Sequence, residues 1–598
     1  MSSGYILGLS RGHNGGACLL KDGKIIFALE EERLSRLKYD GSPFACIKKV
    51  LEYTDKLDAI VICHTQPLEI AGSAEYTGDN IYIALARKFG LIERKVEDLR
   101  NHPQVIDISK QHHKAHAACA FYRSGFSEAA SVVVDGAGTC RPAKFGNDNI
   151  FLWEVESIFD CSYDTGLKTL YKHYGCRDPI NLSFNRNVDS SGISEEGTHT
   201  EIVSGHAGIT KVYEAVTGHA GFEAIEAGKL MGLAPYGKPN NDLPKLFRYD
   251  TVIPISDRTV VIPTYPNSAI INFAMFKSLQ ADANSEDLTK DQNIRDLAYA
   301  AQIETQTMVL DLILTAAKLS KKNKVVLSGG YGLNCVANYS YLERLKEEGI
   351  ELYVEPVSND AGTAIGAALL YYYYNTNDSV PSLNREIYLG PEYNYTNSEI
   401  QNLAAKYNGT VKDVTHNDVV ELMTEKNIVA CFQGRSENGP RALGNRSLMF
   451  DPTFEDGKDF VNQVKRREYF RPFAGSILEE DAHEWFDLRG LESSPHMMYA
   501  VNANERYAEK IPSIIHVDGT CRIQTVNREE NPHYYDIIKT FKEKTGIPII
   551  FNTSFNLGGE PLVETLEDAL WTLQQSDIEY LYLPEYNKLI TIGNFKII

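Results

Sequence analysis

Two histidines and an aspartate give the first indication of chemistry in this chain. His112 and His116 are four positions apart, so on a helix they would lie on one face. Asp135 follows three valines and precedes a glycine, a pattern that predicts the C-terminal end of a buried strand. Two imidazoles and a carboxylate suit zinc or iron. A His-x3-His pair alone favours solvated histidines beside an ordinary strand, but the Asp-Gly-x-Gly turn favours a metal site.

A local basic cluster in the C-terminal part is the second candidate site. The stretch 433–447 places three arginines among glycines, and Arg441 and Arg446 are the pair least typical of a solvated surface. The basic run 465–467 follows, and taken alone it would indicate a solvated surface. Further basic residues come after it. Guanidinium groups bind phosphate or carboxylate with two parallel hydrogen bonds. The stretch 551–556 follows an apolar strand and offers amides and hydroxyls at a common ligand position.

The elements that would position these residues form a repeated pattern. A strand at 5–10 leads into the glycine-rich stretch 11–17 and a hairpin with a turn at Asp22-Gly23; a strand at 130–134 leads into 135–139 and a strand at 150–158. This repetition predicts a duplicated α/β fold. Glycine-rich turns between strands and helices can cradle phosphates, although no P-loop motif is present. Further expected elements are helices at 43–57, from Leu167, at 294–319 and up to Tyr374, and strands at 25–29, 59–62, 324–327 and 351–354.

Length and composition indicate an intracellular protein with more than one domain. The chain has 598 residues, and the polar stretch 375–382 is the clearest linker, which predicts domains at 1–375 and 386–598. The ten cysteines form no Cys-x-x-Cys pair, and we find neither a signal region nor an apolar run of membrane-spanning length. We therefore expect a cytoplasmic protein without a membrane partner. The net charge of −20 disfavours nonspecific nucleic-acid binding.

Ordered motifs over essentially the whole chain resemble the O-carbamoyltransferases of the nodulation and antibiotic-tailoring type. By this resemblance the first domain has a duplicated actin-like ATPase (RNase H-like) fold and the second has a YrdC-like α/β fold. One departure bears on the acceptor pocket: after His13 the family commonly has Asp and then Ser or Ala, whereas this chain has Asn14-Gly15-Gly16. The matching stretches are 8–17, 29–35 with Lys38 and Asp40, 112–116, 135–136, 228–237, 329–338, 439–447, 467–474 and 552–556.

The resemblance implies a two-step reaction and assigns residues to it. Carbamoyl phosphate and ATP form carbamoyl-adenylate with release of pyrophosphate, and an acceptor hydroxyl then displaces AMP. Magnesium would accompany ATP, and iron is the expected bound metal, with zinc or manganese as alternatives. The expected metal ligands are His112, His116, Asp135 and Asp360. The expected catalytic residues are His13, as the base, with Lys38 and Asp40. Nucleotide binding falls on Gly136, Gly138, Glu226, Lys229, Gly329, Gly330 and Asn334. Carbamoyl phosphate binding falls on Arg441, Arg446, Ser447, Lys465, Arg471, His516, Arg522, Asn552 and Ser554.

The acceptor and the competing functions remain open at this point. Candidate acceptors are a sugar or aminoglycoside hydroxyl, another small metabolite, or a hydroxymethylated nucleobase that could lie within DNA; a second copy of the chain in a homodimer is the expected protein partner. An actin-like ATPase or sugar kinase would explain the first domain but not the arginine-rich second one. A carbamoyl-adenylate enzyme of the tRNA-modification type is a further alternative. The hydrogenase-maturation type would need Cys-x-x-Cys zinc fingers, which this sequence lacks.

Overall fold

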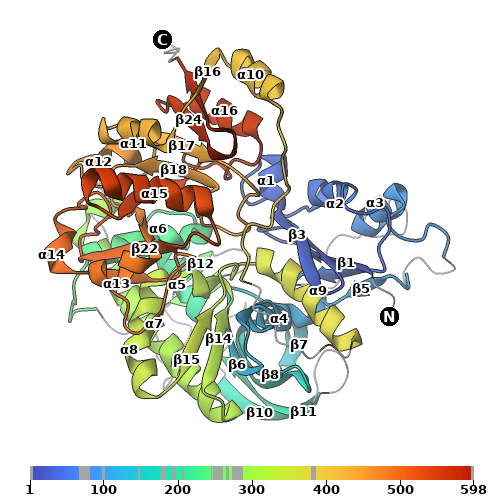
Figure 1. Cartoon of the computed structure of the whole chain (residues 1–598). Coiled ribbons are helices and arrows are strands. Elements are labelled where there is room, and N and C mark those ends of the chain that lie inside the picture. Colours follow the sequence, from blue (N-terminus) through green and yellow to red (C-terminus); the bar gives the residue numbers. More distant parts are fainter. Residues whose placement is uncertain are drawn as a thin grey trace. The chain divides into compact units, whose positions relative to one another are not determined.

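The computed structural model describes residues 4–65, 81–96, 102–145, 148–176, 183–190, 197–204, 208–243, 246, 260–263, 268–271, 287–376, 378 and 385–593. Two units are distinguished: unit 1 comprises residues 1–31 and 39–385, and unit 2 comprises residues 32–38 and 386–598 (Figure 1). Within unit 2, Arg33 donates to the Gly439 carbonyl at 2.7 Å and Arg36 to the Leu562 carbonyl at 2.6 Å. The segment 32–38 therefore packs with unit 2 despite its N-terminal position. Most of the expected linker lies outside the described residues.

The first sheet of unit 1 is built around β1 (Tyr5–Ser10). β1 is antiparallel to β2 (Gly16–Lys21), which continues through the expected hairpin into antiparallel β3 (Lys24–Glu30). On its other side β1 is parallel to β4 (Ala59–Cys63), and β4 is parallel to β5 (Val105–Asp107). The strand order is β3-β2-β1-β4-β5.

The second sheet of unit 1 repeats this order around β6 (Glu128–Val134). β6 is antiparallel to β8 (Asp148–Ser162), which pairs with β9 (Gly166–Cys176). β6 is parallel to β14 (Lys324–Ser328), and β14 to β15 (Glu351–Val354). The shared order confirms the duplicated α/β fold of the actin-like ATPase (RNase H-like) class. The sheet is extended by β7 (Cys140–Phe145), β10 (Ser183–Ser190) and β11 (Gly197–Ser204), while β12 (Val260–Pro263) and β13 (Ser268–Ile271) form a separate pair.

Two buried helices, α4 (His112–Ser124) and α9 (Ala361–Asn375), pack against each other in unit 1. Their close approach depends on Gly366, where a Cβ would lie 1.8 Å from the Ala115 carbonyl oxygen. Only glycine fits this contact, so the histidine-bearing start of α4 is held near the start of α9. The other helices of unit 1 are α2 (Phe44–Val50), α3 (Ile81–Phe89), α5 (Ile209–His219), α6 (Ala227–Leu233), α7 (Gln292–Ser320) and α8 (Cys335–Glu347), and α1 (Glu31–Ser35) begins at its boundary.

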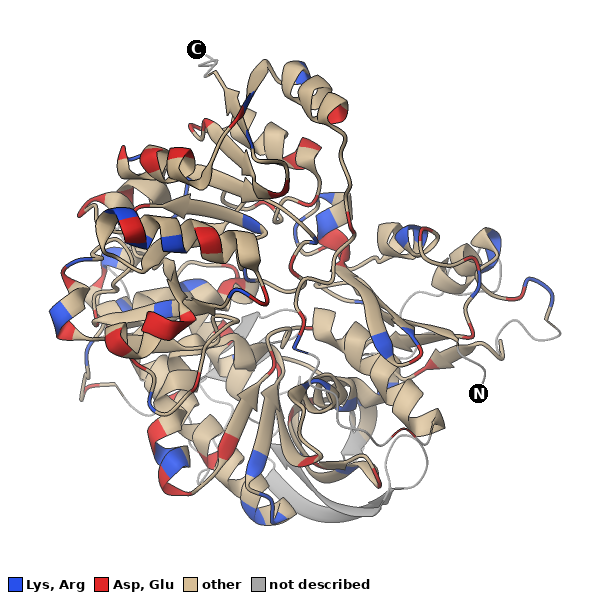
Figure 2. Cartoon of the chain, in the orientation of Figure 1, with Lys and Arg blue, Asp and Glu red and all other residues tan. Residues whose placement is uncertain are grey.

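Unit 2 is built on a ten-stranded mixed sheet, in agreement with the expected YrdC-like α/β class. Its helix α15 (Pro532–Thr545) packs on two of the strands, and acidic and basic residues are interspersed along its solvent side (Figure 2). In sheet order, the strands are β16 (Gly409–Asp413), β25 (Lys588–Ile592), β24 (Tyr580–Leu583), β17 (Val429–Phe432), β18 (Arg446–Phe450), β23 (Ile549–Ser554), β19 (Ala474–Leu478), β22 (Thr520–Val526), β21 (Ala500–Ala503) and β20 (Phe486–Asp487). The other helices are α10 (Asn397–Lys406), α11 (His416–Thr424), α12 (Gly457–Val464), α13 (Ala482–Trp485), α14 (Glu505–Ala508) and α16 (Leu566–Gln574).

Two of the expected helices differ from the structure. The segment from Leu167 is not helical but forms strand β9, antiparallel to β8 across a turn that ends at Gly166, which has a φ of 69°. Leu167 and Thr169 are buried while Lys168 is not, and this period of two is that of a strand. The helix expected at 43–57 is only α2, because the chain turns directly after Val50. The long helix expected at 294–319 is confirmed as α7.

Candidate active site

Four buried side chains converge in unit 1 at the carboxyl end of β6. His112 and His116 come from α4, Asp135 follows β6, and Asp360 directly precedes α9. Their ligand atoms all lie within 4.8 Å of one another. His112 Nε2 is 3.6 Å from Asp135 Oδ2 and 3.5 Å from Asp360 Oδ1, and His116 Nε2 is also 3.5 Å from Asp360 Oδ1. The structure thus brings together all four residues expected to bind a metal.

The geometry of this cluster fits a single metal ion. A tetrahedral ion bound at about 2.1 Å from each ligand keeps neighbouring ligands about 3.4 Å apart, close to the separations in this cluster. Within the described part of the chain, His112 Nε2 and His116 Nε2 are buried and make no hydrogen bond. Buried polar nitrogens without a partner are rare, and a metal ion would satisfy both.

The charges of the cluster also favour a cation. Burial alone would lower the pKa of His112, but the carboxylates of Asp360 and Asp135 raise this pKa well above its ordinary value. Burial opposes ionisation of Asp360, yet His13 and His112 hold the pKa of Asp360 well below its usual range. The raised pKa of His112 and the lowered pKa of Asp360 both mean that positive charge is stabilised at this point, as expected of a site for a divalent ion.

His13 lies beside the metal-ligand cluster, on the loop that follows β1. Its Nδ1 is 3.6 Å from Asp360 Oδ2, and its side chain is 31% exposed. Asp40 shapes the neighbouring loop: its carbonyl accepts from the Gly15 N–H at 3.0 Å, and its Oδ1 accepts from the Ser42 N–H at 3.0 Å. Lys38 pairs with Glu32 at 2.7 Å within the segment that packs with unit 2. Among the three expected catalytic residues, His13 therefore lies next to a metal-ligand candidate.

Two glycine turns meet around Asp135. Gly329 has a φ of 86°, and a Cβ there would lie 2.3 Å from the Val134 carbonyl oxygen, so a larger residue would push the turns apart. The Gly330 N–H donates to Asp135 Oδ1 at 3.1 Å, and the Gly138 N–H donates to the Glu154 carbonyl at 2.8 Å. These contacts connect the glycine turns expected to bind nucleotide with the metal-ligand cluster.

A lysine and a glutamate that the sequence did not indicate lie beside Gly136. Lys211 and Glu214 of α5 form an ion pair at 2.7 Å, and Lys211 is fully buried. A Cβ on Gly136 would lie 2.6 Å from Glu214 Oε1 and 3.4 Å from Lys211 Nζ. Burial raises the pKa of Glu214. An i, i+3 pair of opposite charges normally occupies a solvated helix face, so sequence alone gave no reason to select these residues.

The remaining expected nucleotide-binding residues have contacts that stabilise their own segments. Glu226 and Lys229 form an ion pair at 2.8 Å, and Glu226 also completes a capping box at the start of its helical turn. Asn334 caps α8 by accepting from the Ala337 N–H at 3.1 Å, and its amide donates to Gln302 at 3.0 Å. Nucleotide contacts of these three residues stay a prediction.

In unit 2, several basic side chains lie close together with too little negative charge beside them. Burial, followed by the charges of Arg467 and Arg471, lowers the pKa of Lys465 well below its ordinary value. Burial, followed by Arg471 and Arg522, likewise lowers the pKa of Arg467. The Nε atoms of Arg467 and Arg522 are buried and make no hydrogen bond among the described residues. Mutual repulsion of this kind indicates a site for an anion. We call Lys465, Arg467, Arg471 and Arg522 the cation cluster.

The sheet of unit 2 aligns further expected residues with this cluster. Arg522 on β22 and Asn552 on β23 both pair with Ala474 of the intervening strand β19. Lys465 Nζ donates to the Ser554 carbonyl and lies 3.3 Å from Ser554 Oγ. His516 is 8% exposed, and its main chain closes the turn that leads into β22. Strands β22 and β23, on either side of β19, and the turn after α12 therefore supply residues of the candidate anion site.

The loop 437–447 is organised by two buried charges. Glu437 Oε1 accepts from the N–H groups of Leu443 at 2.7 Å, Asn445 at 2.9 Å and Arg446 at 3.3 Å. Arg446 is fully buried and donates five hydrogen bonds, all to main-chain carbonyls of residues 433, 434, 445 and 564. Ser447 Oγ accepts from the Gly444 N–H at 2.9 Å. These contacts give Arg446 and Ser447 a structural role, while Arg441 lies half-buried on the same loop.

The described helices include none that is both long and apolar enough to cross a membrane.

Comparison with known proteins identifies the family. The family model for the carbamoyltransferase N-terminus matches residues 68–369, and that for the carbamoyltransferase C-terminus matches residues 420–588. The uncharacterized protein sll1178 of Synechocystis is 30% identical over 97% of this chain and 96% of its own length. Nodulation protein NolNO of Sinorhizobium fredii is 29% identical over 96% of this chain and 78% of its own length. The 3'-hydroxymethylcephem-O-carbamoyltransferase of Streptomyces clavuligerus is 28% identical over 59% of this chain and 63% of its own length. These matches confirm the resemblance seen in the motifs: the chain belongs to the carbamoyltransferase family and is an enzyme that transfers a carbamoyl group.

Proposed function

We propose that this carbamoyltransferase forms carbamoyl-adenylate from carbamoyl phosphate and ATP in unit 2 and transfers the carbamoyl group to an acceptor hydroxyl in unit 1. The observation that carries the proposal is the cation cluster, where Lys465 and Arg467 are held beside further positive charge. Carbamoyl phosphate is a small anion that would neutralise this charge. Membership of the family shows which group is transferred, and the cation cluster supports the proposal that its donor binds in unit 2.

The first step must release both phosphate and pyrophosphate if atoms are to balance. Water cleaves carbamoyl phosphate into carbamate and phosphate, and a carbamate oxygen then attacks the α-phosphorus of ATP, from which pyrophosphate leaves. Lys465, Arg467 and Arg522 would hold the phosphate group of the donor through charge-assisted hydrogen bonds. Arg446 and Glu437 would act as positioning residues, because they fix the loop that carries Arg441.

The second step is attack of the acceptor hydroxyl oxygen on the carbamoyl carbon. The new carbon–oxygen bond forms as the bond from that carbon to AMP breaks, and His13 accepts the hydroxyl proton. Asp360, at 3.6 Å, orients the His13 ring and would stabilise it once protonated. A divalent ion held by His112, His116, Asp135 and Asp360, for which we propose iron with zinc or manganese as alternatives, would supply positive charge for the leaving phosphate. Magnesium would accompany ATP.

The acceptor is proposed to be a hydroxyl group on a small molecule. The name of the Streptomyces clavuligerus relative identifies a hydroxymethyl group on a cephem as its acceptor. Sugars, other metabolites and a hydroxymethylated nucleobase or DNA are the candidate acceptors to be compared directly.

The proposal is tested by separating the two half-reactions. Labelled pyrophosphate should exchange into ATP only when carbamoyl phosphate is present. Arg441→Ala should abolish this exchange, whereas the double variant His112→Ala with His116→Ala should retain exchange and lose transfer to any acceptor. Arg466→Ala is a matched control, because Arg466 is exposed on the same unit and donates to the Gln575 carbonyl. Equal loss of exchange in the Arg441 and histidine variants, with both proteins folded, would contradict the assignment of steps to units.

A further inference from the structure

The side chain of Glu214 offers a hydrogen-bond acceptor next to the metal-ligand cluster of unit 1. Its Oε2 accepts from Lys211 Nζ at 2.7 Å, and its Oε1 makes no hydrogen bond among the described residues. The side chain of Glu214 is 13% exposed, whereas Lys211 is fully enclosed. The lysine therefore fixes one oxygen of the carboxylate, and the other oxygen remains within reach of a ligand.

Two other buried ion pairs of unit 1 use both oxygens of their glutamate. Glu355 pairs with Arg123 through Oε1 and accepts from a tyrosine hydroxyl at 3.0 Å through Oε2. Glu154 pairs with Lys172 through Oε1 and accepts from a main-chain N–H at 3.0 Å through Oε2. Structural pairs are completed in this way because an enclosed polar atom without a partner is costly. The pair at Glu214 is left incomplete, which indicates that a further group binds there.

The uncommitted oxygen of Glu214 lies against the turn that carries a metal ligand. A Cβ on Gly136 would lie 2.6 Å from Glu214 Oε1, and Gly136 directly follows Asp135. Burial raises the pKa of this carboxyl, whereas Lys211 and His13 lower it and Asp135 raises it. The carboxylate is therefore within electrostatic reach of both the proposed base and a metal ligand.

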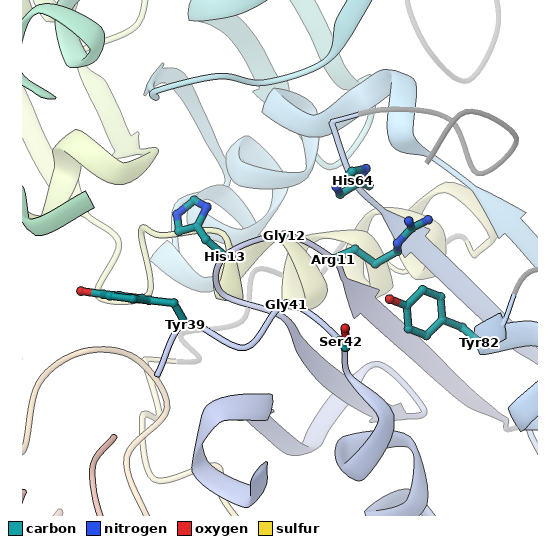
Figure 3. A pocket seen from close by; sticks show the side chains of 8 residues that line it. All are labelled: Arg11, Gly12, His13, Tyr39, Gly41, Ser42, His64 and Tyr82. Atoms are coloured by element: carbon teal, nitrogen blue, oxygen red, sulfur yellow. The ribbon is translucent and has the colours of Figure 1, made fainter. Parts of the chain in front are cut away.

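The acceptor would approach His13 from another side. His13 lines a cavity of about 340 Å³ in unit 1 (Figure 3). The other residues that line this cavity come from the loops after β1 and β4, the segment 39–42 and α3, and none comes from α5, the helix of Glu214. An acceptor bound in the cavity presents its hydroxyl to His13 and leaves Glu214 to face the carbamoyl donor.

The chemistry of the carbamoyl group matches the uncommitted oxygen. The NH2 of a carbamoyl group has two N–H donors, whereas the methyl of an acetyl group, which has nearly the same shape, has none. Neither a metal ion nor Lys211 accepts such a hydrogen bond, and Asp135 Oδ1 already accepts from the Gly330 N–H at 3.1 Å. An NH2 enclosed without an acceptor weakens binding, so the donor needs an oxygen such as Glu214 Oε1.

We propose that Glu214 Oε1 accepts a hydrogen bond from the NH2 of the carbamoyl group in unit 1 and so makes the transfer site specific for carbamoyl over other acyl groups. Lys211 is a positioning residue, because it holds the other oxygen of the carboxylate. The inference rests on the proposed function, in which carbamoyl-adenylate reaches unit 1, and it adds the residue that recognises the transferred group.

Two stable analogues of carbamoyl-adenylate test this recognition. They are the N-carbamoyl and N-acetyl derivatives of adenosine 5'-sulfamate, which differ only in having NH2 or CH3 on the acyl carbon. Isothermal titration calorimetry measures the Kd of each analogue on the full-length, metal-loaded enzyme. The class of sites that the double variant His112→Ala with His116→Ala removes is assigned to unit 1.

Two variants remove the acceptor oxygen in different ways. In Glu214→Gln, Lys211 holds the amide oxygen, so the amide NH2 faces the carbamoyl NH2. The double variant Lys211→Met with Glu214→Met replaces the whole ion pair by apolar side chains of similar size and leaves no buried charge without a partner. Asp311→Asn is the matched control, since Asp311 is an exposed carboxylate on α7, the helix that packs on α5.

In the expected result, the wild type binds the carbamoyl analogue about tenfold or more tightly than the acetyl analogue at the unit 1 site. This preference should fall about tenfold in both Glu214 variants and stay unchanged in Asp311→Asn. Intrinsic differences between the two analogues cancel in the comparison of variants. If one of the Glu214 variants does not fold, the other decides.

Three results would overturn the proposal. They are equal affinity of the wild type for the two analogues, a preference that survives in the Glu214 variants, and an equal loss of affinity for both analogues, which would place Glu214 against the adenosine part. If no class of sites depends on the two histidines, the second step of the proposed function is refuted and the inference with it. Carbamoyl phosphate-dependent pyrophosphate exchange tests the first step separately.

Discussion

Replacing Arg467 by methionine should separate the stability of this enzyme from its affinity for carbamoyl phosphate. In the ligand-free protein, Arg467 lies beside Arg471 and Arg522, and burial and these charges disfavour its ionised form. Its hydrogen bonds to Thr553 Oγ1 at 3.4 Å and to the Pro472 carbonyl at 3.5 Å are long, and its ring contact is with Phe473 at 4.6 Å. Methionine keeps the volume and the contact with Phe473 but removes the charge.

The two expected effects have opposite signs. Replacing a buried, poorly compensated charge by an apolar side chain of similar size is neutral or stabilising by about 1–4 kcal/mol, and partial exposure of Arg467 places the expectation in the lower half of that range. Loss of the cation–π attraction to the Phe473 ring, which the apolar methionine contact does not replace, and of two weak hydrogen bonds offsets about 1 kcal/mol. The free energy of unfolding should therefore stay the same or rise slightly. A lost charge-assisted bond to the donor costs about 1.5–3 kcal/mol, which weakens carbamoyl phosphate binding about 10- to 150-fold.

Thermal unfolding with and without carbamoyl phosphate measures both effects in one experiment. At a ligand concentration of about 100 times Kd, the free energy of unfolding of the wild type should rise by about 2.7 kcal/mol. That of the variant should rise little at the same concentration. Arg466→Met removes an exposed cation one residue away and should change neither quantity. A variant that unfolds more easily in the absence of ligand, yet retains wild-type affinity, would show that Arg467 stabilises the fold and does not bind the donor.

Three further predictions concern the two sites. The double variant His112→Ala with His116→Ala should lose its bound divalent metal, and equal metal content in variant and wild type by elemental analysis would refute the ligand assignment. Glu437→Ala should lower the free energy of unfolding in urea by about 2–4 kcal/mol, because three N–H groups lose their acceptor, and Glu437→Gln should cost less since it retains an acceptor oxygen; the reverse order would contradict this account. Between the lowered folded pKa of Lys465 and its unfolded value of about 10.4, the unfolded state binds more protons, so stability of the ligand-free protein should rise with pH there. Lys465→Met should reduce that rise, and an identical pH slope in variant and wild type would speak against a lowered pKa.

The sequence predicted the metal-ligand cluster well because its signals are local and periodic. A spacing of four residues places His112 and His116 on one helix face, and Asp135 follows an unmistakable buried strand. Asp360 came only from the family motifs, since nothing in its spacing connects it with residues more than two hundred positions earlier. The packing of α4 against α9 at Gly366 makes that connection, and such a close helix crossing depends on side-chain volumes that periodicity does not encode.

Other features failed at the sequence level for identifiable reasons. The segment from Leu167 contains alternating residues typical of a strand, but long polar side chains within it obscured the period. Lys211 looked like one half of an ordinary surface pair, because burial of a charge is decided by tertiary contacts. The sequence also contained no sign that the donors of Arg446 bind main-chain carbonyls, because such partners are set by the folded loop. Its expected contact with carbamoyl phosphate stays a prediction.

Whether a buried charge in this enzyme is structural or functional depends more on whether an opposite charge lies next to it than on how deeply it is buried. Arg123 and Glu355 are both fully buried, but they form an ion pair with each other, so neither requires a ligand. Lys465 and Arg467 instead face like charges, and His112 Nε2 and His116 Nε2 lack hydrogen bonds within the described residues. Because crowded like charges and buried polar groups without hydrogen bonds are costly, these two places support the proposed binding of an anion in unit 2 and of a cation in unit 1. A carbamoyl transfer that begins with an acyl phosphate and ends with departure of AMP needs charge of both kinds.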